Sequence, residues 1–100
     1  MPENNYQALY DEAVAFYENE EFSKARDVLN QILAQSPLEH PAINLLAAVS
    51  YKLNEFLLAE EMAVLGLSLD PDDQLSQDLL KFIENEKNQH ETPFTINIIC

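Results

Sequence analysis

The chain is short of glycine, cysteine, tryptophan and basic residues, and each shortage excludes a class of protein. It has one glycine, Gly66, whereas phosphate-binding loops need several glycines close together and sheet proteins need many turn residues. Its one cysteine, Cys100, cannot form a disulfide within the chain, which suits a reducing compartment. The two histidines, His40 and His90, have no second zinc ligand at a suitable spacing, so we expect neither a metal nor a cofactor.

Positive charge is the other shortage, because five Lys and Arg residues oppose eighteen Asp and Glu residues. The formal charge of −13 repels the phosphates of nucleic acids and anionic membrane surfaces, so neither is an expected partner. No run approaches the roughly 18 apolar residues of a membrane span, and residues 1–5 lack the features of a signal peptide. We therefore expect a cytoplasmic protein.

What the chain does contain is a repeat of 34 residues. Aligning residues 6–39 with residues 40–73 gives eight identities, where about two are expected by chance. The repeat predicts a domain over residues 1–87, with units at 6–39 and 40–73, a capping helix at 74–87, and a tail at 88–100. The identical pairs are Ala8/Ala42, Ala13/Ala47, Tyr17/Tyr51, Glu21/Glu55, Phe22/Phe56, Ala25/Ala59, Leu33/Leu67 and Pro37/Pro71.

Apolar residues within each unit recur at helical spacing, and one polar break divides them into two helices. The predicted helices are 6–18, 21–35, 41–53, 55–69 and 73–87. Their predicted N-caps are Asn5, Asn54 and Asp72 or Asp73. Pro37 and Pro71 stop the second helix of each unit. Small residues are expected where paired helices cross, at Ala13, Ala25, Ala47 and Ala59.

These residues resemble the tetratricopeptide repeat, a helix–turn–helix unit of about 34 residues that reads W-x2-L-G-x2-Y, then A-x3-F, then P. The first unit offers Leu9-x2-Glu12-Ala13-x2-Phe16, Phe22-x2-Ala25-x3-Leu29 and Pro37. The second offers Ile43-x2-Leu46-Ala47-x2-Ser50, Phe56-x2-Ala59-x3-Ala63 and Pro71. The resemblance implies an all-α solenoid of two repeats and a C-terminal capping helix; the alternative is an ordinary helical bundle with the same core residues.

In the tetratricopeptide family the first helix of each repeat lines a concave groove. One row beyond the core of the first helix, Tyr10, Val14 and Tyr17 stand at i, i+4 and i+7, and the repeat carries this row to the later helices. The expected groove residues are Tyr10, Val14, Tyr17, Asn44, Ala48, Tyr51, Lys52, Asp78, Phe82 and Asn85. Such a composition is typical of a peptide-binding surface, although Tyr17 and Tyr51 could instead only fill the space between repeats.

The resemblance also narrows the class of partner that the groove is expected to bind. Tetratricopeptide co-chaperones that grip a C-terminal carboxylate place Lys, Asn and Arg at positions that hold Tyr10, Val14, Leu45, Leu75 and Leu79 here. Since Lys52 is nearly the only groove cation, we expect an apolar or basic partner segment, in the form of an amphipathic helix of another protein. Small chaperones of this type in bacterial type III secretion, which clasp the helix of a needle subunit, are similar in size and in their apolar groove.

The predicted function is therefore a non-catalytic adaptor or chaperone. Paired carboxylates such as Glu60 and Glu61 are typical of solvated helical faces, and no residues indicate an enzyme. Because the repeats leave their ends uncovered, a scaffold that assembles through stacked ends is the alternative, and an acidic mimic of DNA is a third. The tail alternates apolar and polar residues over 94–98, a strand period that could pair with a partner, fold back or stay disordered.

Overall fold

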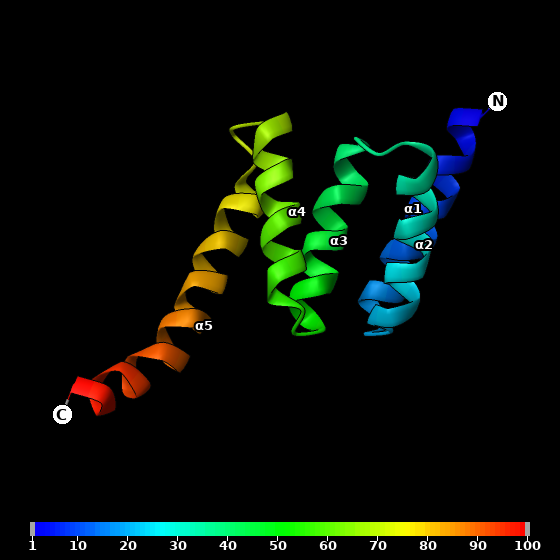
Figure 1. Ribbon diagram of the computed structural model, residues 1–100. Helices are drawn as coiled ribbons and strands as arrows, with labels where there is room; N and C mark the ends of the chain where they lie inside the picture. The colour runs from blue at the N-terminus through cyan, green and yellow to red at the C-terminus, as the bar shows by residue number, and fades with distance from the viewer. Residues whose placement is uncertain (1, 100) are drawn as a thin grey trace.

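The computed structural model describes the backbone of residues 2–99 and the side chains of residues 6–86. Its described backbone consists of helices joined by short turns, without strands, so the predicted all-α class is confirmed (Figure 1). The helices are α1 (Pro2–Glu18), α2 (Phe22–Gln35), α3 (His40–Lys52), α4 (Phe56–Leu69) and α5 (Gln74–Ile99).

The bounds of the three central helices agree with prediction to within one residue at each end. Pro41 occupies the first turn of α3, where its missing N–H would have no helical partner. At the N-terminus, α1 already begins at Pro2. Asn5 therefore lies inside this helix and is not the N-cap that had been predicted. Composition and proline spacing thus fix the middle of the fold better than its termini.

The prediction for the end of the last helix was wrong. Helix α5 continues to Ile99 instead of ending at residue 87, and the backbone over 94–98 is helical although its residues alternate with the period of a strand. A strand needs a neighbouring strand to pair its backbone groups, and the described chain offers none, whereas a helix satisfies its own. The side chains of residues 87–99, and Cys100 altogether, lie outside the described part.

The turn inside each hairpin recurs at the repeat spacing. Glu20 and Asn54 both adopt the left-handed conformation, with φ of 63° and 64°. The next residue's N–H reaches back to the helix in each case, from Glu21 to the carbonyl of Phe16 (2.8 Å) and from Glu55 to that of Ser50 (2.9 Å). This is a Schellman ending, so Asn54 terminates α3 and is not the N-cap predicted for α4.

The helices pack as two antiparallel hairpins followed by α5. Helix α1 packs on α2 and α3 on α4, while α3 also contacts α1 and α5, so the first helices of successive units lie side by side. Within the described chain the backbones of α2 and α4 do not approach closely, although Arg26 of α2 forms a salt bridge of 2.9 Å with Glu55, the residue before α4. The four alanines predicted at the helix crossings are fully buried: Ala13, Ala25, Ala47 and Ala59.

Aromatic contacts repeat along with the turns. The rings of Tyr17 and Phe22 have centroids 5.5 Å apart at 63°, and those of Tyr51 and Phe56 are 5.5 Å apart at 60°. Each ring pair joins the two helices of its hairpin next to the turn. The sequence repeat is therefore also a repeat of local structure.

Candidate functional site

The aromatic strip, defined here as Tyr17, Tyr51 and Phe82, runs across the three helices α1, α3 and α5. The Tyr51 and Phe82 rings lie 6.3 Å apart at 40°, which joins α3 to α5. Tyr17 and Tyr51 both pack against a cluster formed by Ala47, Ala48, Ala63 and Leu79. Both tyrosines are half-buried, and Phe82 is 51% exposed. The strip thus helps to fill the space between units and keeps aromatic surface open to solvent.

Other predicted groove residues occupy varied environments. Val14 is half-buried, whereas Ala48 is buried. Asp78 accepts a hydrogen bond from Gln74 Nε2 at 3.0 Å within α5. Asn44 faces a polar network and Tyr10 lines a pocket; neither belongs to the aromatic strip. The predicted groove residues therefore divide among several surfaces, and a single continuous groove stays a prediction.

An acidic hollow adjoins one end of the strip. It is lined by Tyr17, Phe22, Glu18, Glu20 and Lys52. Carboxylates at this place favour a basic group on anything that reaches Tyr17.

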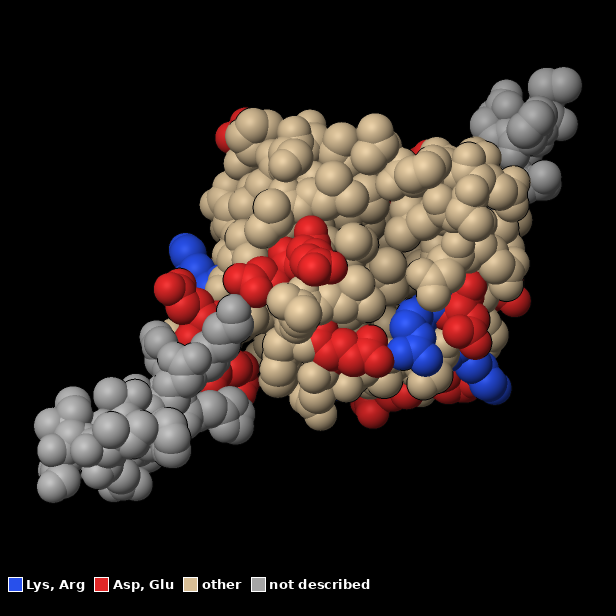
Figure 2. Space-filling model, in the orientation of Figure 1, with Lys and Arg blue, Asp and Glu red and all other residues tan. Residues whose placement is uncertain are grey.

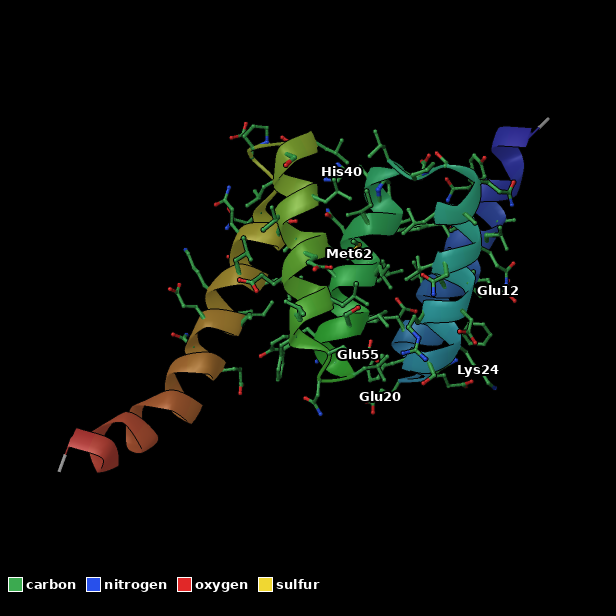
Figure 3. The ribbon with its side chains drawn as sticks, in the orientation of Figure 1. Glu12, Glu20, Lys24, His40, Glu55 and Met62 are labelled. Atoms are coloured by element: carbon green, nitrogen blue, oxygen red, sulfur yellow. The ribbon has the colours of Figure 1, made fainter. Side chains whose placement is uncertain are left out.

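A second arrangement, which we call the polar cluster, consists of His40, Asn44, Asp73 and Ser76. Figure 3 shows His40 at the start of α3, at the end of the molecule where α4 ends and α5 begins. Asp73 Oδ2 lies 2.8 Å from His40 Nε2 and accepts a hydrogen bond from Ser76 Oγ at 2.8 Å. Asp73 Oδ1 accepts from Asn44 Nδ2 and from the backbone N–H of Ser76, both at 3.2 Å. One buried carboxylate thereby fastens α5 to α3.

Asp73 has two structural roles in this cluster. It is the residue before α5, and its bond to the Ser76 N–H caps that helix, as predicted. Its contact with His40 was not predicted, because His40 had been considered as a zinc ligand and not as a partner of Asp73. The missed signal was the pair His40 and Asn44, which stand at i, i+4 where the first unit has Tyr6 and Tyr10.

The polar cluster contains Ser, His and Asp but lacks the order of a catalytic triad. In such a triad the histidine lies between the serine that it deprotonates and the carboxylate that orients it. Here Asp73 lies between His40 and Ser76, and the serine hydroxyl bonds to the carboxylate and lies 3.3 Å from Asn44 Oδ1. Nothing in this geometry activates Ser76 as a nucleophile.

Asp73 is held in its charged form by these donors. Burial alone would raise the pKa of Asp73, but the hydrogen bonds from His40, Ser76 and Asn44 outweigh it and leave the pKa below the usual value. When the pH falls, the unfolded chain therefore takes up a proton on Asp73 before the folded protein does. The contribution of Asp73 to stability is complete above the ordinary aspartate pKa of about 3.9 and is lost as the pH falls through the lower folded value.

We expect Asp73→Asn to lose this pH dependence. The wild type should be more stable than the variant at neutral pH, and the difference in unfolding free energy should shrink as the pH drops below about 4. Urea unfolding of both proteins at a series of pH values measures the difference, because the other carboxylates titrate in both and cancel. A difference that stays constant down to acidic pH would contradict the assignment.

The only glycine allows the polar cluster to approach α4. A Cβ at Gly66 would lie 2.5 Å from Ser76 Oγ, 2.8 Å from Asn44 Oδ1 and 2.9 Å from Asp73 Oδ2. One repeat earlier, the residue at the position of Gly66 is Ile32. Ile32 lines an open pocket of about 310 Å³, and the described residues form no polar network at this position. That pocket is lined by Tyr6, Gln7, Tyr10, Ile32, Glu39, Pro41 and Ala42.

Comparison with known proteins identifies no relative: no protein-family model, no curated protein and no solved structure matches this chain. Among the described residues, no three His, Cys, Asp or Glu side chains gather as a metal site. None of the described helices combines the length and the apolar character needed to cross a membrane.

Proposed function

We propose that this protein is a non-catalytic adaptor or chaperone of tetratricopeptide type that binds an amphipathic helical segment of a partner protein. The main support is the aromatic strip. Tyr17, Tyr51 and Phe82 come from three different helices, the rings of Tyr51 and Phe82 lie 6.3 Å apart, and Phe82 is 51% exposed. Partly exposed aromatic rings with polar handles are enriched where proteins bind one another.

A helical repeat architecture supports the same function. Turns, buried alanines and ring contacts recur between the two hairpins, and the first helices of successive units lie side by side. A tetratricopeptide solenoid would arrange them in this way, with its binding surface on the first helices. The proposed role resembles that of the small type III secretion chaperones, a similarity of fold and size.

Charge sets the preferred partner. The chain carries a formal charge of −13, and the hollow beside Tyr17 contains Glu18 and Glu20. A partner helix with an apolar face and a basic polar face would place its cations against these carboxylates.

The alternative, a scaffold of stacked repeat ends, is less well supported. On α3 three residues of the repeat, Ile43, Ala47 and Ser50, are fully buried. At the repeat spacing α5 has Gln77, Lys81 and Glu84, of which the last two are exposed. Such a polar outer face is typical of a capping helix.

The N-terminal end is polar in the same way. Leu46 and Val49 of α3 are buried in the cluster shared with the first hairpin. The corresponding residues of α1 are Glu12 and Ala15, both exposed, and Asp11 beside them is exposed as well. Stacking a second copy on either end would therefore bury charges without partners.

The proposed function predicts that Tyr17→Ala with Tyr51→Ala weakens binding of a basic amphipathic helix by at least about tenfold, because two central aromatic contacts are lost. The probe is a labelled synthetic helix with a leucine-rich face and a lysine-rich face. Its affinity for the full chain is measured by fluorescence anisotropy. A second peptide with the same apolar face and a glutamate-rich face should bind more weakly to the wild type.

Leu57→Ala is the matched control, because Leu57 is 70% exposed and belongs to α4, outside the strip. It should leave the affinity unchanged. Circular dichroism must show that the double variant keeps its helices. Unchanged affinity in a helical double variant, or no binding of either peptide to the wild type, would contradict the proposal.

A further inference from the structure

The outer helices α2 and α4 differ sharply in character although they occupy equivalent places in the repeat. Five exposed or half-exposed positions that are polar in α2 are apolar in α4. The pairs are Ser23/Leu57, Lys24/Leu58, Asn30/Val64, Gln31/Leu65 and Gln35/Leu69. In α4, Leu57 is 70%, Val64 51% and Leu69 39% exposed. A solvent-facing helix does not need these apolar residues, as α2 demonstrates.

Three of these apolar residues, Val64, Leu65 and Leu69, lie in an uncharged part of an otherwise acidic molecule. No Asp, Glu, Lys or Arg occurs in residues 28–38 or 62–69, which form the C-terminal halves of α2 and α4 and the turn after α2. Figure 2 shows charged side chains gathered towards the hairpin turns and a wide uncharged area over these C-terminal halves. We call this area the uncharged outer face.

We propose that the uncharged outer face binds a second copy of this chain in a symmetric dimer. Two copies that each carry −13 repel one another wherever carboxylates would meet, so they can approach closely only through an uncharged area. A two-fold axis lets the same patch serve both partners. A basic partner protein, in contrast, would find no opposite charge on this face and would bind the acidic surfaces instead.

The size of the face sets the expected strength of the dimer. Eight helical residues span about 12 Å, and two helices side by side measure about 20 Å across. Such an area, about 240 Å² per copy, is below the size of stable interfaces, so only a weak and transient dimer is expected. The dimer should therefore form in a concentration-dependent manner.

Sedimentation velocity on the full chain tests the proposal. The dimer fraction should rise with protein concentration and also with salt, because salt screens the repulsion between the copies. Val64→Glu with Leu69→Glu places carboxylates on the face and should raise the dissociation constant at least about tenfold. Both positions are exposed, so the variant should keep the helical circular dichroism of the wild type.

A variant with the same added charge elsewhere is the matched control. Ala8→Glu with Asn85→Glu adds two carboxylates at exposed positions of α1 and α5, and it should still dimerise. Tyr17→Ala with Tyr51→Ala should dimerise as well, so a failure of the proposed peptide binding is distinguishable from a failure here. A wild type that stays monomeric at every concentration and salt level would overturn the proposal, as would equal weakening in the outer-face variant and the charge control.

Discussion

Asp73→Ala should lower the free energy of unfolding by about 2–4 kcal/mol, the largest loss expected from any single substitution of a polar residue in the described chain. The variant loses the cap of α5 and the acceptor for His40, Asn44 and Ser76 at once. The Asp73 side chain is 4% exposed, so water cannot easily replace the lost acceptor. Urea unfolding at neutral pH, followed by circular dichroism, measures the loss.

Asp72→Ala is the control for this prediction. Asp72 neighbours Asp73 and carries the same charge, but it is exposed on the turn before α5. Its replacement should change the unfolding free energy by no more than about 0.5 kcal/mol. If both variants lost equal stability, the effect would come from net charge or from the turn, and the polar cluster would not be what fastens α5 to α3.

Much of the fold could be predicted because its signals are local and repeated. Pro37 and Pro71 forbid helix at fixed places, and the spacing of apolar residues shows which side of each helix is buried. The alanines at the helix crossings were predictable for the same reason, since Ala25 and Ala59 recur with the prolines. Tyr17 and Tyr51 were also recognisable, because they occupy the same repeat position on the first helix of each unit.

The polar cluster could not be predicted in this way because it depends on how the helices stack. His40 and Asp73 are 33 residues apart, and only the packing of α3 against α5 brings them together. The prediction that Asn54 is an N-cap was wrong for a different reason. An asparagine before a helix is a good N-cap, yet it also tolerates the left-handed conformation that ends α3. Glu20, the equivalent residue of the first unit, adopts the same φ without an amide side chain. The repeat therefore requires the left-handed conformation at this position and not an N-cap.

Gly66→Ala should destabilise the protein by about 1–3 kcal/mol, although alanine is the better helix former by about 1 kcal/mol. The added methyl would lie 2.5–2.9 Å from three oxygen atoms of the polar cluster, so α5 or the cluster must move. Overpacking and the loss of hydrogen bonds to Asp73 outweigh the gain in helix propensity. Ser68→Ala, at an exposed position of the same helix, is the control and should change stability by no more than about 0.5 kcal/mol.

The cause of that loss can be isolated with Ser76→Ala, which removes the nearest of the three oxygen atoms. The apolar counterpart occurs one repeat earlier in the chain, with Ile32 at the position of Gly66 and Ala42 at the position of Ser76. Gly66→Ala with Ser76→Ala should therefore lose at least about 0.5 kcal/mol less than the sum of the two single variants. The relief stays partial, because Asn44 Oδ1 and Asp73 Oδ2 remain within 2.9 Å of the new methyl. Additive losses, or a Gly66→Ala protein more stable than the wild type, would mean that α4 and α5 separate freely and that close approach is not why this helix contains glycine.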